Sequence, residues 1–316
     1  MLPFQKINHF PGSFNLGKKN QLGKNLSKMK QKHPQDYDFF PKTWLLPYQY
    51  EELRNYYEKQ KPKKPVLIVK PEAGSQGKGI CIIKSIQKLT NDQHVVVQEY
   101  IKNPYLIEGL KFDFRVYVLL RSVNPLKIFL YREGLARFAT VKYQKPKRSN
   151  VKNLCMHLTN YAINKLNENF QFNKDAFQDN IGHKRSLSSV LKLLSDKEVD
   201  VDKLLVQIKQ IINKTMCSVQ PYLSHLYNSS QLKSENNQMC FEIFGFDIML
   251  DQFMKPFLLE VNHTPSFTTD TPLDYNIKHC LIMDTLILIN TRYKDKKQQV
   301  QIYIFIFINL FNKKVF

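Results

Sequence analysis

Two apolar segments near the end of the chain each carry a carboxylate where a buried side chain is expected. The first covers residues 241–251 and contains Asp247, and the second leads into Glu260 and Asn262. This pattern predicts two strands joined by a turn at 252–255. Because residues two apart on a strand share a face, Glu260 and Asn262 should project together, and Asp247 joins them if the strands pair.

An ionised carboxylate in an apolar sheet is costly unless a cation or a hydrogen-bond partner compensates it. Three hard oxygen ligands on adjoining strands suit Mg²⁺, which proteins hold with few side chains plus substrate phosphates. We therefore expect Asp247, Glu260 and Asn262 to be magnesium ligands. The alternative is an ordinary hairpin that exposes one acid on each strand.

The chain has 316 residues, enough for a sizeable core and for two or three subdomains of one enzyme. Its 43% hydrophobic and 12% aromatic residues argue against disorder over most of its length. The 47 Lys and Arg against 27 Asp and Glu give a net charge of +20, which predicts an anionic partner. Nucleic acid, anionic membrane and acidic protein tails all fit that charge, so charge alone does not select among them.

The cysteines and the termini indicate the compartment. The five cysteines are scattered and form no C-x-x-C motif, which predicts buried thiols in a reducing compartment. The N-terminus lacks a continuous apolar stretch, so no secretory signal is expected. Residues 302–311 are strongly apolar but too short for a membrane span, which needs about 20 residues; a buried strand and a poorly folded tail both fit them.

Hydrophobic periodicity predicts a mixed α/β (α+β) chain. Strands are expected in five short apolar segments, and helices near both ends of the second half. We place the strands at 66–69, 80–83, 95–100, 112–120 and 127–131, a turn at Glu133–Gly134, and helices within 186–227 and 274–290. A basic loop with five Lys or Arg and no acid covers 142–152.

A glycine-rich stretch at 70–79 joins the first two predicted strands. It lacks the spacing of a phosphate-binding P-loop and no helix follows it, so we expect a β-hairpin that covers a ligand. Glycines let a backbone approach phosphates closely, and Lys70 and Lys78 can neutralise them. A solvated glycine and lysine turn explains the same residues equally well.

Charged side chains alternate with apolar ones on the fourth predicted strand. Lys111, Asp113 and Arg115 share one face, and Phe112 lies on the opposite, core face. Three charges in a row favour a binding face, although an exposed edge strand also accommodates them. Arg137, placed after the predicted turn, can hold a carboxylate by bidentate hydrogen bonds. The polar residues 157–161 are ambiguous by themselves.

Together these segments resemble the tubulin-tyrosine-ligase-like family, which has the ATP-grasp fold. The resemblance covers about residues 8–290 in family order. The matching pieces are 8–11, 40–44, 70–80, 111–115, 131–134, 157–160 and 241–267. It implies a remnant of the family's N-terminal domain at 1–62, apparently truncated, a central domain at 63–108, a C-terminal domain with the metal site at 109–292, and a tail of uncertain structure at 293–316.

The resemblance implies an ATP-dependent amino-acid ligase. Members of the family phosphorylate an acceptor carboxylate, and the amine of a free amino acid attacks the acyl phosphate. Asp247, Glu260 and Asn262 match the Mg²⁺ ligands. The residues that match the ATP pocket are Lys19, Lys70, Gln76, Gly77, Lys78, Gln98, Glu99, Tyr100, Ile101, Lys111, Phe112, Asp113, Thr159 and Asn160.

Amino-acid choice follows from a second group of residues. Arg137, Tyr161 and Lys278 occupy positions similar to those that hold the free amino acid in glutamate-adding members. Glutamate has two carboxylates, so two cationic partners make physical sense. Arg115 and Glu260 are implied in catalysis, and His263 beside Asn262 is implied to contact the acceptor. A histidine there favours elongation of glutamate chains over initiation, and a structural role for His263 is the alternative.

The resemblance is closer to polyglutamylases than to tyrosine ligases or glycylases. It implies tubulin or microtubules with acidic C-terminal tails as the partner, free L-glutamate as substrate, and cytoplasmic, cytoskeletal and ciliary or basal-body localisation. We expect a monomer with no nucleic-acid partner and no membrane span. The rival interpretations are glycine or tyrosine ligation and a catalytically silent microtubule-binding module. A nucleic-acid binder is supported by nothing except the charge, and we rank it last.

Overall fold

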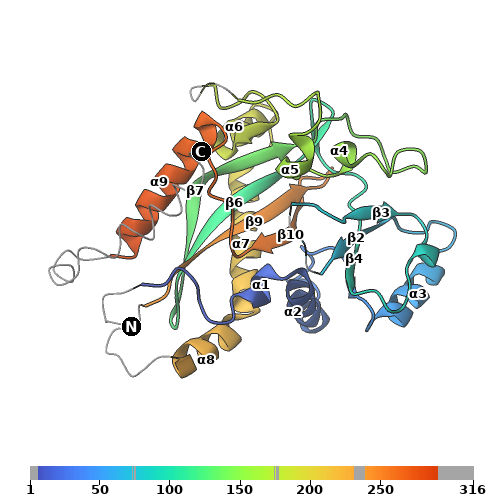
Figure 1. Ribbon diagram of the computed structural model, residues 1–316, viewed down its shortest axis with the longest axis horizontal. Helices are drawn as coiled ribbons and strands as arrows, with labels where there is room; N and C mark the ends of the chain where they lie inside the picture. The colour runs from blue at the N-terminus through green and yellow to red at the C-terminus, as the bar shows by residue number, and fades with distance from the viewer. Residues whose placement is uncertain are drawn as a thin grey trace.

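The computed structural model describes residues 6–72, 74, 76–173, 175, 178–230 and 239–290. Two antiparallel sheets lie next to each other, and helices cover their outer sides (Figure 1). The predicted mixed α/β class is therefore correct. Residues 302–311, which we expected to form a strand or a tail, lie outside the described residues.

The larger sheet carries most of the hydrophobic core. Its strand order is β10-β9-β6-β7-β8, and β5 pairs with β6. These strands are β5 (Leu106–Ile107), β6 (Leu110–Val123), β7 (Leu126–Phe138), β8 (Lys184–Ser186), β9 (Glu242–Leu250) and β10 (Pro256–Asn262). The predicted alternation on β6 is confirmed, because Phe112, Phe114 and Val116 all belong to the core cluster.

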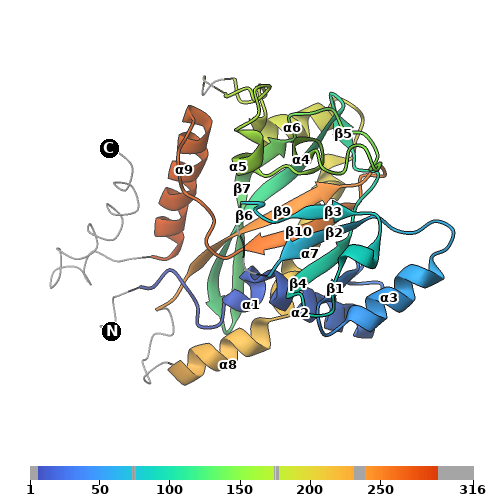
Figure 2. The ribbon, with the colours of Figure 1, turned by 45° about the vertical axis from the view of Figure 1, so that its right-hand side comes forward.

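Four long helices cover the two faces of this sheet. The core face packs against α6 (Leu187–Ser195), α7 (Val201–Cys217) and α8 (Gln220–Ser230). On the other face, α9 (Pro272–Leu288) packs its buried side chains against Tyr117 and Leu135 (Figure 2). None of the described helices is apolar over a length that a bilayer crossing would need.

The smaller sheet has the order β1-β4-β2-β3. Its strands are β1 (Thr43–Leu45), β2 (Leu67–Pro71), β3 (Cys81–Ile83) and β4 (Val95–Glu99). The helices α3 (Tyr50–Lys59) and η1 (Ile86–Lys88) pack against one face of this sheet. The short helix α1 (Phe14–Gly17) and the helix α2 (Lys19–Lys32) lie beside both sheets in Figures 1 and 2. Two more short helices, α4 (Leu154–His157) and α5 (Tyr161–Asn164), flank a segment that lines a cleft between the sheets. Charged side chains of both sheets meet in this cleft.

A β-bulge in β10 aligns two acidic residues. Leu258 pairs with Ile248, but Glu260 pairs with Asp247, so β10 uses one residue more than β9 across this step. An extra residue of this kind reverses the alternation of side chains along the bulged strand. As a result Leu258 and Val261, three apart, both reach the core, whereas Glu260 faces the cleft and Asn262 lines a second hollow next to it.

The turn predicted at Glu133–Gly134 is wrong, because both residues lie inside β7. Gly134 pairs with Val116, next to an irregularity in the β6–β7 register, and a Cβ at Gly134 would lie 2.5 Å from the carbonyl oxygen of Arg115. The glycine thus permits a close approach of two strands and does not mark a reversal. Arg137 consequently sits on a strand and not after a turn.

The helical prediction for 186–227 is confirmed, and the stretch consists of α6, α7 and α8; Ser186 and Asp200 cap the N-termini of α6 and α7 with their side chains, and Glu198 between these helices has a positive φ of 62°. One further expectation needs correction. The cysteines are mostly not buried: Cys81, Cys217 and Cys280 are exposed, Cys155 is half-buried and Cys240 is buried. The sequence shows only that they are scattered, which does not determine their depth.

Candidate active site in the cleft between the sheets

A cleft lies between the two sheets. Strands β2 and β4 form one wall, and β6, β9 and β10 form the other. Apolar side chains line part of it, and both acids and bases line the rest. The apolar residues are Ile68, Ile80, Leu158 and Met249, and the polar residues include Lys70, Gln98, Lys111, Asp113, Arg137, Thr159, Asn160, Asp247 and Glu260. Such a mixture suits a flat apolar ring attached to anionic groups.

Lys70 on β2 presents an ammonium group to the cleft. Its Nζ donates hydrogen bonds to Gln98 Oε1 at 2.8 Å and to the carbonyl of Leu259 at 3.4 Å. The Gln98 side chain in turn donates to Thr43 Oγ1 at 2.9 Å, which fixes its orientation. Burial lowers the pKa of Lys70 to about 8, against the opposing effect of Glu260.

Lys111 on β6 is held by the Tyr100 side chain and by a backbone carbonyl. Its Nζ donates to Tyr100 Oη at 3.0 Å and to the His157 carbonyl at 2.8 Å, and it lies 4.3 Å from the centroid of the Tyr100 ring. Burial lowers the pKa of Lys111 to about 7 and that of His157 to about 4. His157 is therefore a neutral, buried structural residue.

The segment 98–101 offers backbone groups at the edge of the apolar part of the cleft. The N–H groups of Glu99 and Tyr100 donate to the carbonyls of Lys42 and Val66, at 2.9 Å each. Within the part of the chain that the structure describes, the N–H of Ile101 has no acceptor. A purine edge can use such a free donor at the end of a strand.

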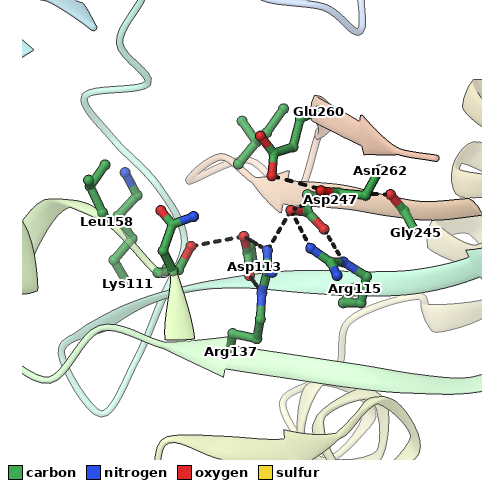
Figure 3. A network of polar contacts seen from close by, with 12 residues as sticks. Lys111, Asp113, Arg115, Arg137, Leu158, Gly245, Asp247, Glu260 and Asn262 are labelled. Atoms are coloured by element: carbon green, nitrogen blue, oxygen red, sulfur yellow. Dashed lines mark hydrogen bonds and ion pairs between the residues drawn. The ribbon is translucent and has the colours of Figure 1, made fainter. Parts of the chain in front are cut away.

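Asp247, Glu260 and Asn262 meet at one end of the cleft, as Figure 3 shows. The Nδ2 atom of Asn262 lies 3.5 Å from Asp247 Oδ2 and 3.4 Å from Glu260 Oε1. Burial and the neighbouring Asp247 raise the pKa of Glu260. Against the effect of burial, Arg115 and Arg137 hold the pKa of Asp247 well below its usual range. The hairpin thus brings the three predicted ligands together.

These three residues fit a divalent cation. Two carboxylates and one amide supply hard oxygens, and the repulsion between the buried carboxylates is what a cation relieves. Groups of three or more His, Cys, Asp or Glu with metal-binding geometry are absent from the described residues, so the set depends on the amide of Asn262. A small number of protein ligands is typical of Mg²⁺ held together with phosphates.

Two arginines contact the same acids. Arg115 forms a bidentate pair with Asp247, in which Nη2 to Oδ2 is 2.9 Å. Arg137 donates from Nε and Nη2 to the two oxygens of Asp113 at 2.8 and 2.6 Å, and its Nη2 lies 2.7 Å from Asp247 Oδ2. Thr159 also donates to Asp113 at 2.8 Å. Arg137 therefore links two carboxylates on adjacent strands (Figure 3).

The glycine-rich turn borders a second hollow next to the cleft. Lys19, Gln76, Gly77 and Lys78 line this hollow, and Lys19 Nζ donates to the Gly74 carbonyl at 2.6 Å. Gly77 has φ +80°, and a Cβ there would lie 2.5 Å from the Ile163 side chain. The antiparallel pairing of β2 with β3 confirms the predicted hairpin.

His263 lines the second hollow and not the main cleft. It packs against Gly17 at the end of α1. A Cβ added at Gly17 would lie 1.9 Å from the imidazole Nδ1 of His263, so a larger residue does not fit there. Its ring centroid is 6.4 Å from that of His9, which pairs with the buried Glu242 at 2.9 Å. His263 is thus next to both the metal ligand candidates and the N-terminal helices.

Tyr161 and Lys278 lie in a neighbouring cluster that sequence analysis only partly identified. Lys184 Nζ is 2.6 Å from Asp274 Oδ2 and 3.7 Å from the centroid of the Tyr161 ring. Lys278 Nζ is 3.1 Å from Asp274 Oδ1. Lys184 also pairs across the strands with Arg137, so it connects this cluster to the cleft.

Lys184 and Asp274 were missed because each looks ordinary in sequence. Lys184 stands in a short basic segment, and Asp274 stands in the first turn of α9, where an acid is common. One carboxylate that faces two buried lysines leaves a local excess of positive charge. Phe112, in contrast, faces the core and stacks on Phe138 at 5.3 Å, so its side chain does not reach the nucleotide pocket that we predicted.

The model of one protein family matches residues 1–299, and its description is the tubulin-tyrosine ligase family. The chain belongs to this family. The ATP-grasp-like fold of the family agrees with the two antiparallel sheets that enclose the cleft. The predicted resemblance is therefore confirmed.

Curated relatives of the family cover nearly all of this chain. It is 56% identical over 298 residues to the "Probable beta-tubulin polyglutamylase" of Tetrahymena thermophila, 44% identical over 301 residues to the human "Tubulin polyglutamylase TTLL6", and 42% identical over 301 residues to the human "Tubulin polyglutamylase TTLL7". These matches cover 94%, 95% and 94% of this chain, but 25%, 33% and 34% of the relatives. The chain thus spans between a quarter and about a third of the length of these three relatives.

Proposed function

We propose that this chain forms the ligase core of a tubulin polyglutamylase, which uses ATP and Mg²⁺ to join free L-glutamate to glutamate side chains of acidic tubulin tails. The observation that carries the proposal is the meeting of phosphate-directed lysines with an oxygen-rich acidic end in one cleft. The names of the relatives, tubulin polyglutamylases at 42–56% identity, support the substrate class.

In this proposal the apolar part of the cleft holds the adenine ring. The free N–H of Ile101 supplies a donor to the purine edge, and Glu99 lies beside it. Lys70 and Lys111 approach the phosphates from opposite sheets. From the second hollow, Lys19, Gln76, Gly77 and Lys78 reach the same phosphates, because Ile80 and Glu260 line both spaces.

The chain's own groups account for the charge changes of ligation. Mg²⁺ on Asp247, Glu260 and Asn262 would neutralise charge on the transferred phosphoryl group. The acceptor carboxylate takes the γ-phosphoryl group of ATP, and ADP is released. The amine of glutamate then attacks the acyl carbon, the bond from that carbon to the phosphate oxygen breaks, and phosphate and the amine proton leave. Arg115 lies at the acidic end, where it can stabilise the negative charge that develops on the acyl oxygen.

Glutamate as the added amino acid is supported by the cation-rich cluster beside the cleft. Arg137, Lys184 and Lys278 surround this region, and Tyr161 packs its ring on Lys184. Two carboxylates of a free glutamate require at least two such partners. A glycine-adding enzyme needs only one, so a second buried lysine favours glutamate.

Elongation of existing glutamate chains is proposed from His263. Its ring lies in the hollow that borders the metal ligand candidates, where a second carboxylate-bearing residue of the acceptor fits. The exposed basic loop, with Lys142, Lys145, Lys147 and Arg148, would attract acidic tails over a distance of about 8 Å at physiological salt. We further propose a monomeric protein of the cytoplasm and cytoskeleton, with cilia or basal bodies as its setting.

Mass spectrometry of tubulin tail peptides tests the proposal. Unmodified and singly branched peptides are incubated with ATP, Mg²⁺ and one of glutamate, glycine or tyrosine. We expect glutamate addition, and its restriction to branched peptides would establish elongation. Addition of glycine or tyrosine instead would overturn the proposal for the amino acid. If the protein still binds ATP but adds no amino acid, the silent microtubule-binding alternative is favoured.

A further inference from the structure

Four charged side chains form a chain of ion pairs at the acidic end of the cleft, in the order Arg115, Asp247, Arg137 and Asp113, which we name the arginine–carboxylate quartet. Asp113 and Asp247 are each 2% exposed, and the arginine side chains are 12% and 11% exposed. Two carboxylates face two guanidinium groups, so the quartet is neutral as it stands. A neutral, internally paired site has little attraction for a further anion.

Arg137 is not free to bind a carboxylate in this arrangement. Its Nε and one Nη2 proton are directed to Asp113, as the distances of 2.8 and 2.6 Å indicate. A bidentate carboxylate on the remaining edge needs one proton from Nη1 and the other from Nη2. Nη1 has no partner in the described parts of the chain, but Nη2 lies 2.7 Å from Asp247 Oδ2. On the Nη1/Nη2 edge of Arg137, which we call its open fork, Asp247 thus occupies one of the two donors.

Asp247 is also one of the three candidate metal ligands, and this shared role couples two sites. A divalent cation on Asp247, Glu260 and Asn262 takes a share of the Asp247 charge and repels the nearby guanidinium groups. It also changes the neutral quartet into a region of positive charge. Asp113 keeps Arg137 in place through its own bidentate pair, so Arg137 loses one partner without losing its position.

We propose that Arg137 is a metal-gated receptor: it stays on Asp247 until a divalent cation occupies the adjoining ligands, and its fork then binds a carboxylate of the amino-acid substrate. This inference rests on the proposed glutamate-ligase function. It assigns an order of binding, in which the amino acid follows the metal and its nucleotide. Such an order keeps the amino acid out of a site that cannot yet activate the acceptor.

Equilibrium dialysis of radiolabelled glutamate against the full chain tests the gate. A non-hydrolysable ATP analogue is present throughout, with either Mg²⁺ or EDTA. We expect wild-type protein to bind glutamate about tenfold or more tightly with Mg²⁺, because one charge-assisted hydrogen bond is gained. Asp247→Asn, which removes the negative charge that holds Nη2, should bind glutamate in EDTA more tightly than the wild type does.

Glu260→Gln is the matched control, because it makes the same chemical change at a metal ligand that has no contact with Arg137 in the described structure. Its glutamate binding in EDTA should remain as weak as that of the wild type. Equal rises in Glu260→Gln and Asp247→Asn would overturn the gate in favour of general electrostatics. Thermal melting of each variant checks that the fold is retained.

Two outcomes separate the gate from the function on which it rests. Equal wild-type affinity for glutamate in Mg²⁺ and EDTA would overturn the gate and leave glutamate ligation in place. Absence of glutamate binding in both conditions would overturn both the gate and the proposed function. Reciprocity supplies an independent readout: glutamate should tighten Mn²⁺ binding, followed by electron paramagnetic resonance, by the same factor.

Discussion

Lys70 donates a 2.8 Å hydrogen bond to Oε1 of Gln98, and both side chains are buried in the cleft. The resemblance placed Gln98 among the residues that contact the nucleotide, whereas its side chain is used to orient a lysine. Thr43 on β1 holds the amide from the other side at 2.9 Å. We therefore expect Gln98 to influence a bound nucleotide by positioning Lys70.

The pKa of Lys70, lowered to about 8, predicts a pH dependence of ATP binding. Free protein loses this charge as pH rises through 8, whereas bound phosphates favour the protonated lysine, so affinity should fall above pH 8 by up to about tenfold per pH unit. Loss of the Lys111 charge, with a pKa of about 7, begins the decline earlier. Calorimetric titration with ATP between pH 6.5 and 9.5 measures it, and Lys70→Arg should flatten the upper part of the curve.

Glu260→Gln should abolish ligation and leave the fold intact. The substitution keeps the shape of a buried side chain but removes a carboxylate from the proposed magnesium set. We expect a loss of about 10²-fold or more in kcat, in the range of a missing electrostatic contact to the transition state. Normal tubulin glutamylation by a variant with an unchanged melting temperature would contradict the metal assignment.

Lys184→Met should raise the KM for glutamate with a small effect on the KM for ATP. Lys184 pairs with Asp274 at 2.6 Å, and its replacement removes one of two buried cations beside the cleft. The expected rise is about tenfold or more, as for a charge-assisted hydrogen bond of about 1.5–3 kcal/mol. Lys165→Met is the matched control, because Lys165 contacts the same Tyr161 ring at 5.2 Å but is exposed.

His263→Ile should lower elongation relative to initiation. The imidazole lies in the hollow next to Asn262, where the acceptor is proposed to enter, and isoleucine cannot hydrogen-bond to an acceptor carboxylate. The ratio of products on branched and unmodified peptides, counted by mass spectrometry, provides the measurement. An unchanged distribution of chain lengths would count against an acceptor contact by His263.

Phe138→Ala should destabilise the fold by about 3–5 kcal/mol, the usual cost of a large aromatic deletion in a core. Phe138 is 1% exposed and stacks on Phe112 at 5.3 Å, directly behind the strand that carries Asp113. Phe129→Ala on the same strand is the control: Phe129 is 39% exposed, and the effect should be below about 1 kcal/mol. Urea unfolding curves measure both changes.

Much of the candidate site follows from the period of two in a strand. Lys111, Asp113 and Arg115 alternate with core residues, and the predicted hairpin brings the strands of Asp247 and Glu260 together, although the bulge that aligns the two acids was not predicted. The segments 66–69, 80–83, 95–100 and 274–290 also lie close to the observed elements. Local pattern alone was sufficient wherever one face of an element is apolar.

The remaining features depend on contacts between distant segments. Lys184 lies beside the cleft only because β8 pairs with β7, and it has a carboxylate partner only because α9 places Asp274 next to it. The helix α2 lies in a lysine-rich stretch with few apolar residues, so its pattern did not predict a helix. Gly134 resembled a turn because the sequence does not reveal that Arg115 approaches it from the neighbouring strand.

The irregular step in β10 makes the acidic end sensitive to the number of residues on each strand. With regular pairing beyond Leu258, Leu259 would stand opposite Asp247, and Glu260 would turn toward the helices. A deletion of Leu259 should therefore make the pairing regular and keep Glu260 opposite Asp247, whereas an insertion beside Leu259 should displace Glu260 from Asp247 while every ligand is still present in the sequence. Residues 252–255 at the hairpin tip lie outside this count, so changes of length there should be tolerated. Among homologues, insertions in this hairpin would then be confined to the tip, far along the strands from the acidic end.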